Sequence, residues 1–164
     1  MFREMRRKKQ LLTIEESEQI LREAKTAMLG LSGDDGYPYV VPVNYAYVDG
    51  KIYFHGAKTG HKIDAIMRSD KVSLCVVQHD ELVPEALTTC FRSVTVFGRA
   101  RILENDAEKL AAAQKFGMRF YPDKDKVDNE IRREWDALCV VEITPEHITG
   151  KEAIELARAR KAEK

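Results

Sequence analysis

The chain has 164 residues, of which 44% are hydrophobic, and its 27 basic side chains balance 27 acidic ones. This length fits a single domain, 1–164, that can bury a sizeable core. A net charge of zero provides no global field to attract nucleic acid or a membrane surface, and no apolar run approaches the length of a bilayer span. We therefore expect neither nucleic acid nor membrane as a partner.

The first segment of the chain, 1–12, is a basic arm, which lacks the apolar segment of a secretory signal. It could dock on a partner subunit or a ligand, or remain a solvated tail. Cys75, Cys90 and Cys139 are odd in number and form no C-x-x-C pair, which predicts a reduced, cytoplasmic setting. The histidines show no ligand spacing, so no metal site is expected.

Thr13 and Glu16 form a capping box that begins the first predicted helix. A short strand over 27–31 leads through a turn to a long alternating strand over 38–48. Asp49-Gly50 is a strong hairpin signal, and a strand over 51–55 returns from it.

The second half of the chain begins with a helix over 59–68, followed by strands over 72–78 and 91–103. Gly98 inside the long strand indicates a bulge or a close backbone contact. The elements predicted after it are a helix that begins at Asn105 and ends before Pro122, a short helix around Val127, Ile131 and Trp135, a strand over 138–143 and a helical tail over 150–164.

These elements predict a mainly β fold with helices (α+β). About six strands follow one another too closely to alternate with full crossover helices. Their hairpin-type connections favour an antiparallel β-barrel over a βαβ array.

The most informative segment is Tyr53–Ile66, in which glycines flank a basic turn. His61 and Lys62 fall in the first turn of the predicted 59–68 helix, where cations oppose the helix dipole unless an anion lies opposite. Free N–H groups, glycine backbone and cationic side chains together predict a phosphate site. The alternative is a solvated helix start whose lysine points away.

Three segments together resemble the pyridoxamine 5'-phosphate oxidase-like family of FMN-binding Greek-key split barrels with six strands. They are similar above all to its nitroimidazole-resistance (Nim-type) branch. The matching segments are Gly36–Tyr45, Tyr53–Lys62 and Phe91–Ala100, with weaker support from Met5–Arg7 and Ile148–Ala153.

The resemblance implies a homodimer that holds two FMN molecules in grooves between its subunits. It places Val43 and Asn44 at the edge of the flavin ring, and His55 and Gly56 near the ring and the ribityl chain. The remaining residues that it assigns to FMN are Lys58, Thr59, His61 and Lys62 at the phosphate, and Arg92 and Ser93 from the other subunit.

The chain departs from the oxidases of that family at two positions. His61 stands where arginine is common, and Gly60 where a hydroxyl residue is common. The arginine-rich C-terminal substrate segment is missing as well, which argues against pyridoxal phosphate synthesis. The branch implies instead an FMN oxidoreductase that takes electrons from a reduced nicotinamide donor and reduces small planar nitroimidazoles or nitroaromatics. The alternatives are haem or a deazaflavin in the same groove, or a flavin-binding module without turnover.

The residues themselves support parts of this assignment. Pro42 interrupts a strand ladder, so its segment is expected at an edge or bulge where backbone near Val43 and Asn44 is free for a ligand. His55 ends a strand beside a glycine, where it could deliver a proton to substrate or simply bond a carbonyl. His55 is the only residue that we expect to be catalytic.

Overall fold

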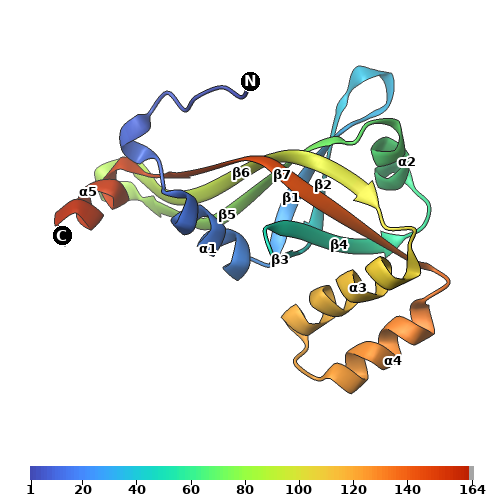
Figure 1. Cartoon of the computed structure of the whole chain (residues 1–164). Helices are drawn as coiled ribbons and strands as arrows, with labels where there is room; N and C mark the ends of the chain where they lie inside the picture. The colour runs from blue at the N-terminus through green and yellow to red at the C-terminus, as the bar shows by residue number, and fades with distance from the viewer. Residues whose placement is uncertain (163–164) are drawn as a thin grey trace.

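The computed structural model describes residues 1–162, which form an antiparallel sheet surrounded by helices (Figure 1). The seven strands are β1 (Thr26–Ser32), β2 (Pro38–Asn44), β3 (Ala46–Val48), β4 (Lys51–Ala57), β5 (Lys71–Val83), β6 (Thr88–Ile102) and β7 (Leu138–Glu152). The α-helices are α1 (Ile14–Glu23), α2 (His61–Arg68), α3 (Asp106–Phe120), α4 (Lys124–Glu134) and α5 (Ile154–Ala162). Three short 3-10 turns are η1 (Lys8–Gln10), η2 (Asp34–Gly36) and η3 (Pro84–Ala86).

The predicted strand over 38–48 is broken at Tyr45, so the sheet has seven strands instead of six. The order of the strands is β2-β1-β5-β6-β7-β4-β3, and its two ends, β2 and β3, are separated by Tyr45 alone. This side chain is fully buried, and its hydroxyl donates a hydrogen bond to the carbonyl of Leu21 at 2.9 Å. Because the two ends are neighbours along the chain, the sheet curls round on itself. The predicted split barrel is confirmed.

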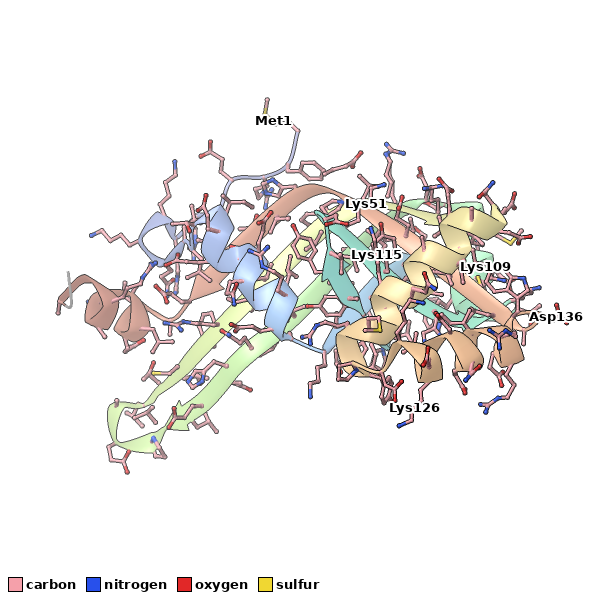
Figure 2. All side chains as sticks on the ribbon, turned by 60° about the horizontal axis from the view of Figure 1, so that its bottom comes forward. Met1, Lys51, Lys109, Lys115, Lys126 and Asp136 are labelled. Atoms are coloured by element: carbon pink, nitrogen blue, oxygen red, sulfur yellow. The ribbon has the colours of Figure 1, made fainter. Side chains whose placement is uncertain are left out.

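Three strands extend well beyond their predicted limits. β5 and β6 continue to Val83 and from Thr88, forming a long hairpin that projects from the body (Figure 2). The prediction that Gly150 begins the tail helix is wrong, because Gly150 lies within β7. A Cβ at this position would stand 2.2 Å from Ser17 Oγ, so glycine allows α1 to approach β7. The tail helix is α5, and 163–164 lie outside the described residues.

Several local signals are confirmed. Thr13 caps α1 reciprocally with Glu16, as the capping box requires. Asp49 and Gly50 have φ angles of 53° and 74°, the left-handed pair of a two-residue hairpin turn. At Gly98 the register between β6 and β7 shifts, and a Cβ there would stand 2.5 Å from the Thr144 carbonyl.

Two apolar cores lie on opposite sides of β4 and β7. The larger fills the barrel and includes Phe54 of β4 and buried residues of α1 and α2. The smaller packs Tyr53 and Val140 against α3 and α4, which form a separate layer below the barrel (Figure 1). Consecutive residues of β4 therefore face different cores, which decides where each site residue points. Within 1–162 no helix is long and apolar enough to cross a bilayer.

Candidate functional site

The N-terminus of α2 presents backbone donors beside a glycine. Gly60, the residue before the helix, has a φ of 123°, which other residues rarely adopt. No side chain among the described residues caps this end of the helix. The first N–H groups that bond within the helix are those of Ile63 and Asp64, both to the Gly60 carbonyl. The earlier donors are available to an anion.

Lys62 lies beside these donors and points along β4. Its ammonium nitrogen is 5.9 Å from the centre of the Phe54 ring and near the bare backbone of Gly56. Within 1–162 no carboxylate lies within salt-bridge distance of it. A half-buried ammonium group without a counter-ion is costly, so this position favours an anionic ligand. The structure thus brings Gly56 and Lys62 together.

His61 is already engaged by the turn between β1 and β2. Its ring stacks on Tyr39, with centroids 4.0 Å apart, and its Nε2 is 3.4 Å from Asp34 Oδ2. Arg68 Nη1 lies 2.6 Å from Asp34 Oδ1, and this hydrogen bond is the main reason that the pKa of Asp34 is lowered. His61 therefore ties α2 to the turn, and Lys62 is the unpaired cation of the pair.

His55 lies on the opposite face of β4 from Gly56 and Phe54. Its ring meets the edge of Phe116 in α3, with centroids 4.6 Å apart. Desolvation lowers the pKa of His55, and the nearby ammonium of Lys62 lowers it further. The imidazole is therefore neutral at neutral pH, a state in which it can donate one hydrogen bond and accept another.

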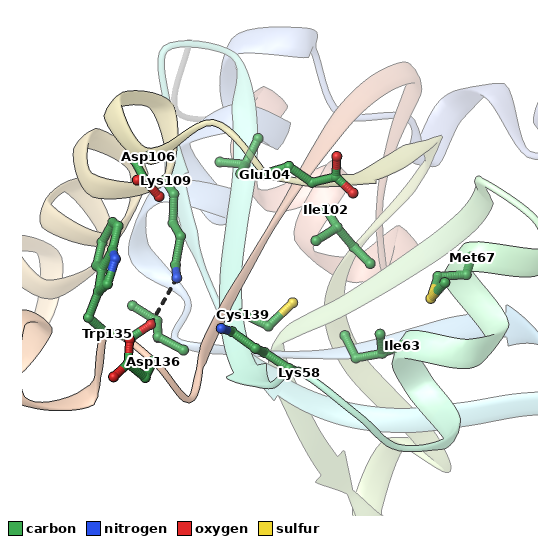
Figure 3. Close-up of a pocket in the computed structure, with 12 residues that line it drawn as sticks. Lys58, Ile63, Met67, Ile102, Glu104, Asp106, Lys109, Trp135, Asp136 and Cys139 are labelled. Atoms are coloured by element: carbon green, nitrogen blue, oxygen red, sulfur yellow. Dashed lines mark hydrogen bonds between the residues drawn. The ribbon is translucent and has the colours of Figure 1, made fainter.

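A cavity of about 370 Å³ opens beside this helix, between α2 and α3; we call it the α2–α3 cavity (Figure 3). Lys58, from the loop before α2, lines it together with Cys139 of β7 and Lys109 of α3. Burial raises the pKa of the Cys139 thiol, while the ammonium groups of Lys109, Lys58 and Lys62 act in the opposite direction. Three cations therefore surround one buried thiol.

Of the other predicted site residues in β2 and the loop before α2, Val43 is buried, whereas Asn44 and Thr59 are exposed. Val43 is 7% exposed and packs in the barrel core. The amide nitrogen of Asn44 donates to the Lys25 carbonyl at 3.3 Å and to Thr26 Oγ1 at 3.1 Å. Thr59 is exposed beside the α2 N-terminus. β2 stands at one end of the strand order, as Pro42 predicted.

Arg92 and Ser93 lie far from this helix within one chain. Arg92 precedes Ile102, which lines the α2–α3 cavity, by ten residues of β6, or roughly 30 Å of extended strand. Its Nε donates to the fully buried Glu152 at 3.2 Å, in a groove beside α1. One chain therefore does not bring Arg92 to Lys62.

A family model described as pyridoxamine 5'-phosphate oxidase matches residues 13–152. The chain belongs to this family. Membership in the pyridoxamine 5'-phosphate oxidase family agrees with the split barrel. The matched range, 13–152, includes every site residue named above. No curated protein gives a significant match to the chain.

Solved structures share the fold of this pyridoxamine 5'-phosphate oxidase family member. A candidate 5-nitroimidazole antibiotic resistance protein from Bacteroides thetaiotaomicron is 23% identical with a TM-score of 0.70, covering 87% of this chain and 86% of that one. An FAD-binding protein from Mesorhizobium loti is 24% identical, with a TM-score of 0.64 and coverages of 87% and 96%. An FAD and haem binding protein from Mycobacterium smegmatis is 20% identical, with a TM-score of 0.74 and coverages of 88% and 73%.

Sequence reasoning missed three residues around the site. Lys109 occupies the buried side of α3, whereas the neighbouring Leu110 is 41% exposed. Its spacing to Ala112 and Ala113 was the available signal. Phe116 and Tyr39, the ring partners of His55 and His61, sit in apolar patterns that do not reveal such contacts.

Proposed function

We propose that this protein binds FMN, with the flavin phosphate at the N-terminus of α2. The observation that carries the proposal is the uncapped first turn of α2, which contains Lys62, a lysine without a carboxylate partner among residues 1–162 whose ammonium lies near the bare backbone of Gly56. Lys58 and Thr59 flank the same position. These groups fit a phosphate, because they supply charge, donors and space at one place. His61, held by Asp34 and Tyr39, fixes the orientation of the helix end.

We propose further that the bound flavin accepts electrons from a reduced nicotinamide donor and passes them to a small planar nitroimidazole or nitroaromatic. The flavin supplies this electron transfer, and the protein supplies its binding, orientation and electrostatics. The likeness in fold to the Bacteroides protein supports the choice of nitro compounds as substrates.

In this proposal Val43 and Asn44 approach the edge of the ring through the backbone of β2, since the Val43 side chain is buried. His55 keeps its proposed catalytic role as a hydrogen-bond donor toward the reacting groups. The lowered pKa makes the neutral ring the donor at neutral pH.

The site is completed by a second copy of the chain in a homodimer. Arg92 and Ser93 are too distant from Lys62 along β6 to reach the same FMN within one subunit. A two-fold arrangement would supply both residues from the other subunit. Exposed apolar side chains on the projecting hairpin, Val77, Leu82 and Leu87, support an interface there.

The decisive experiment titrates FMN into apoprotein of wild type, Lys62→Ala and Lys71→Ala. Lys71 is an exposed strand lysine, and among residues 1–162 no carboxylate lies within salt-bridge distance of it, which makes it a matched control. Loss of a charge-assisted bond should weaken FMN binding about ten- to a hundredfold in Lys62→Ala only. Equal affinities in all three proteins would remove Lys62 from the site.

Turnover is tested separately by stopped-flow reoxidation of the reduced protein with a nitroaromatic, in wild type and His55→Ala. A catalytic His55 predicts slower reoxidation at unchanged flavin content, with a changed pH profile. Parallel profiles would leave His55 as a packing contact of Phe116. The alternative, a flavin- or haem-binding module without turnover, has support from the fold shared with the Mycobacterium smegmatis protein. An absorbance spectrum separates flavin from haem, and steady-state oxidation of a nicotinamide donor separates enzyme from module.

A further inference from the structure

The orientation of His55 depends on a ring contact. Among residues 1–162 its imidazole has no hydrogen-bond or ion-pair partner. Instead it meets the ring of Phe116 in α3, a helix that runs beneath β4 (Figure 1), with centroids 4.6 Å apart and ring planes 80° apart. A functional histidine is usually oriented by a hydrogen bond to one of its two nitrogens. In this chain an aromatic side chain takes the place of that bond.

Phe116 is itself held in place by the C-terminal half of α3. Phe120 follows one helical turn later, and the centroids of the two rings are 5.0 Å apart. Between them in the sequence, Arg119 Nη2 donates to the carbonyls of Arg22 and Glu23, at 2.6 and 2.9 Å. These carbonyls end α1 and have no partner within that helix. The two bonds tie α3 to α1, so Phe116 keeps its place against β4.

The fourth helix supports α3 from another side. A Cβ on Gly117, the residue after Phe116, would stand 2.5 Å from Val127 Cγ1 in α4. Glycine therefore allows α4 to pack closely on α3. Because close-packed helices resist small displacements, Phe116 is carried by a rigid support with neighbours on two sides.

The surroundings of His55 offer no carboxylate to balance a protonated imidazole. Desolvation lowers the pKa of His55, and the ammonium of Lys62 on α2 lowers it further. On α3, Lys115 is paired with a carboxylate of the turn between β3 and β4. On the strands, Glu142 of β7 accepts hydrogen bonds from Tyr53 of β4 and from two cations. In such surroundings the imidazole stays neutral while its apolar cover remains.

We propose that Phe116 is a positioning residue of the site, which holds the imidazole of His55 in the orientation that its catalytic role requires. The inference rests on the proposed function, in which His55 donates a hydrogen bond toward the reacting groups. Phe116 acts through His55 and not on the substrate. Without the Phe116 ring, the imidazole can turn about its side-chain bonds, and water reaches its nitrogens.

The first test is an NMR titration of the four histidines in flavin-free protein, in which the His55 signal is identified by its loss in His55→Gln. In Phe116→Ala the pKa of His55 should rise from its lowered value toward about 6.5, because water replaces the ring. Phe116→Tyr retains the ring and should keep the wild-type pKa. Met118→Ala, an exposed substitution on the same helix, is the control and should leave the titration unchanged.

The second test is stopped-flow reoxidation of the reduced, FMN-loaded proteins with a nitroaromatic. Loss of an aromatic contact of this kind changes an equilibrium by up to about tenfold, so Phe116→Ala should slow reoxidation about three- to tenfold. The pH at which the rate falls on acidification should move upward with the pKa of His55, and FMN affinity should not change. The double variant His55→Ala/Phe116→Ala should react no more slowly than His55→Ala, because Phe116 acts through His55.

An unchanged pKa of His55 in folded Phe116→Ala would overturn the inference and leave the proposed function intact. A double variant slower than His55→Ala would do the same, because Phe116 would then act independently of His55. Unchanged reoxidation in His55→Ala itself would overturn the catalytic role of His55 in the proposed function, and this inference with it. If Phe116→Ala does not fold, Phe116→Leu, which keeps an apolar side chain without the ring, is judged by the same results.

Discussion

The ammonium nitrogen of Lys62 lies 3.5 Å from the position that a Cβ on Gly56 would occupy. This is ordinary van der Waals separation, so a methyl group at residue 56 would touch the lysine without moving it, whereas a larger side chain would displace it. The size of residue 56 therefore limits where the ammonium group can lie.

Substitutions at Gly56 should separate the size of the residue from its flexibility. Gly56→Ala places a methyl group at contact distance and should preserve FMN affinity. Gly56→Val suits a strand but adds two methyl groups that displace Lys62, so FMN should bind about tenfold more weakly. Titration of FMN, with thermal unfolding as a check on folding, measures both. Wild-type affinity in a folded Gly56→Val would show that the position of Lys62 does not matter.

His55 should make the stability of the protein depend on pH. Its pKa is lowered in the folded state, so below about pH 6.5 the unfolded chain binds a proton more readily. The free energy of unfolding should therefore fall as the pH decreases from that value toward the lowered pKa, and His55 should contribute no such change above it. His55→Gln should remove this part of the dependence. Urea unfolding at pH 7.5 and pH 5.5 measures the unfolding free energy of both proteins. The same decrease between the two pH values in wild type and His55→Gln would contradict the prediction.

Glu152 should be essential to the end of the barrel near α5. It is fully buried, with Arg92 Nε at 3.2 Å and Arg160 Nη2 at 2.8 Å from its two oxygens. Glu152→Ala removes the carboxylate partner of Arg92 and one of the two carboxylates that pair with Arg160, the other being Glu16, and should cost about 3–5 kcal/mol of unfolding free energy. The lower end is expected, because both arginines reach solvent. Chemical denaturation measures the change, with the exposed Glu85→Ala as control. A loss equal to that of the control would refute it.

The homodimer should be detectable directly. Light scattering at micromolar concentration is expected to give twice the chain mass of 18.8 kDa. The physical reason is the separation of Arg92 from Lys62 along β6, together with the exposed apolar side chains Val77, Leu82 and Leu87 on the β5–β6 hairpin. A monomer that still bound FMN tightly would exclude the shared groove.

Local chemistry made much of the fold predictable. The capping box at Thr13, the Asp49-Gly50 turn and the contact at Gly98 each depend on a few adjacent residues. The extension of β5 to Val83 was not predictable from periodicity, because Gln78–Leu82 is largely exposed and shows no apolar alternation. Pairing with β6 maintains that part of the strand. Such long-range pairing leaves little trace in the local sequence.

The surroundings of the candidate site could be predicted from the sequence only in part. The glycines on either side of the basic turn indicated the position of Lys62, because glycine allows the turn and leaves the backbone accessible. Lys109 was hidden because a lysine on the buried side of a helix is rare, and the carbonyl that holds it comes from Trp135. The stacking of His61 on Tyr39 likewise joins residues that no local pattern connects.

The junction at Tyr45 has a consequence for how the barrel can vary. Tyr45 alone joins β2, which pairs with β1, to β3, which pairs with β4. A single residue therefore connects the two ends of the sheet. Because side chains alternate with a period of two, an inserted residue at this connection would turn every β3 side chain to the opposite face. Inserted residues can be accommodated at the tips of the hairpins, whereas the number of residues between β2 and β3 is fixed.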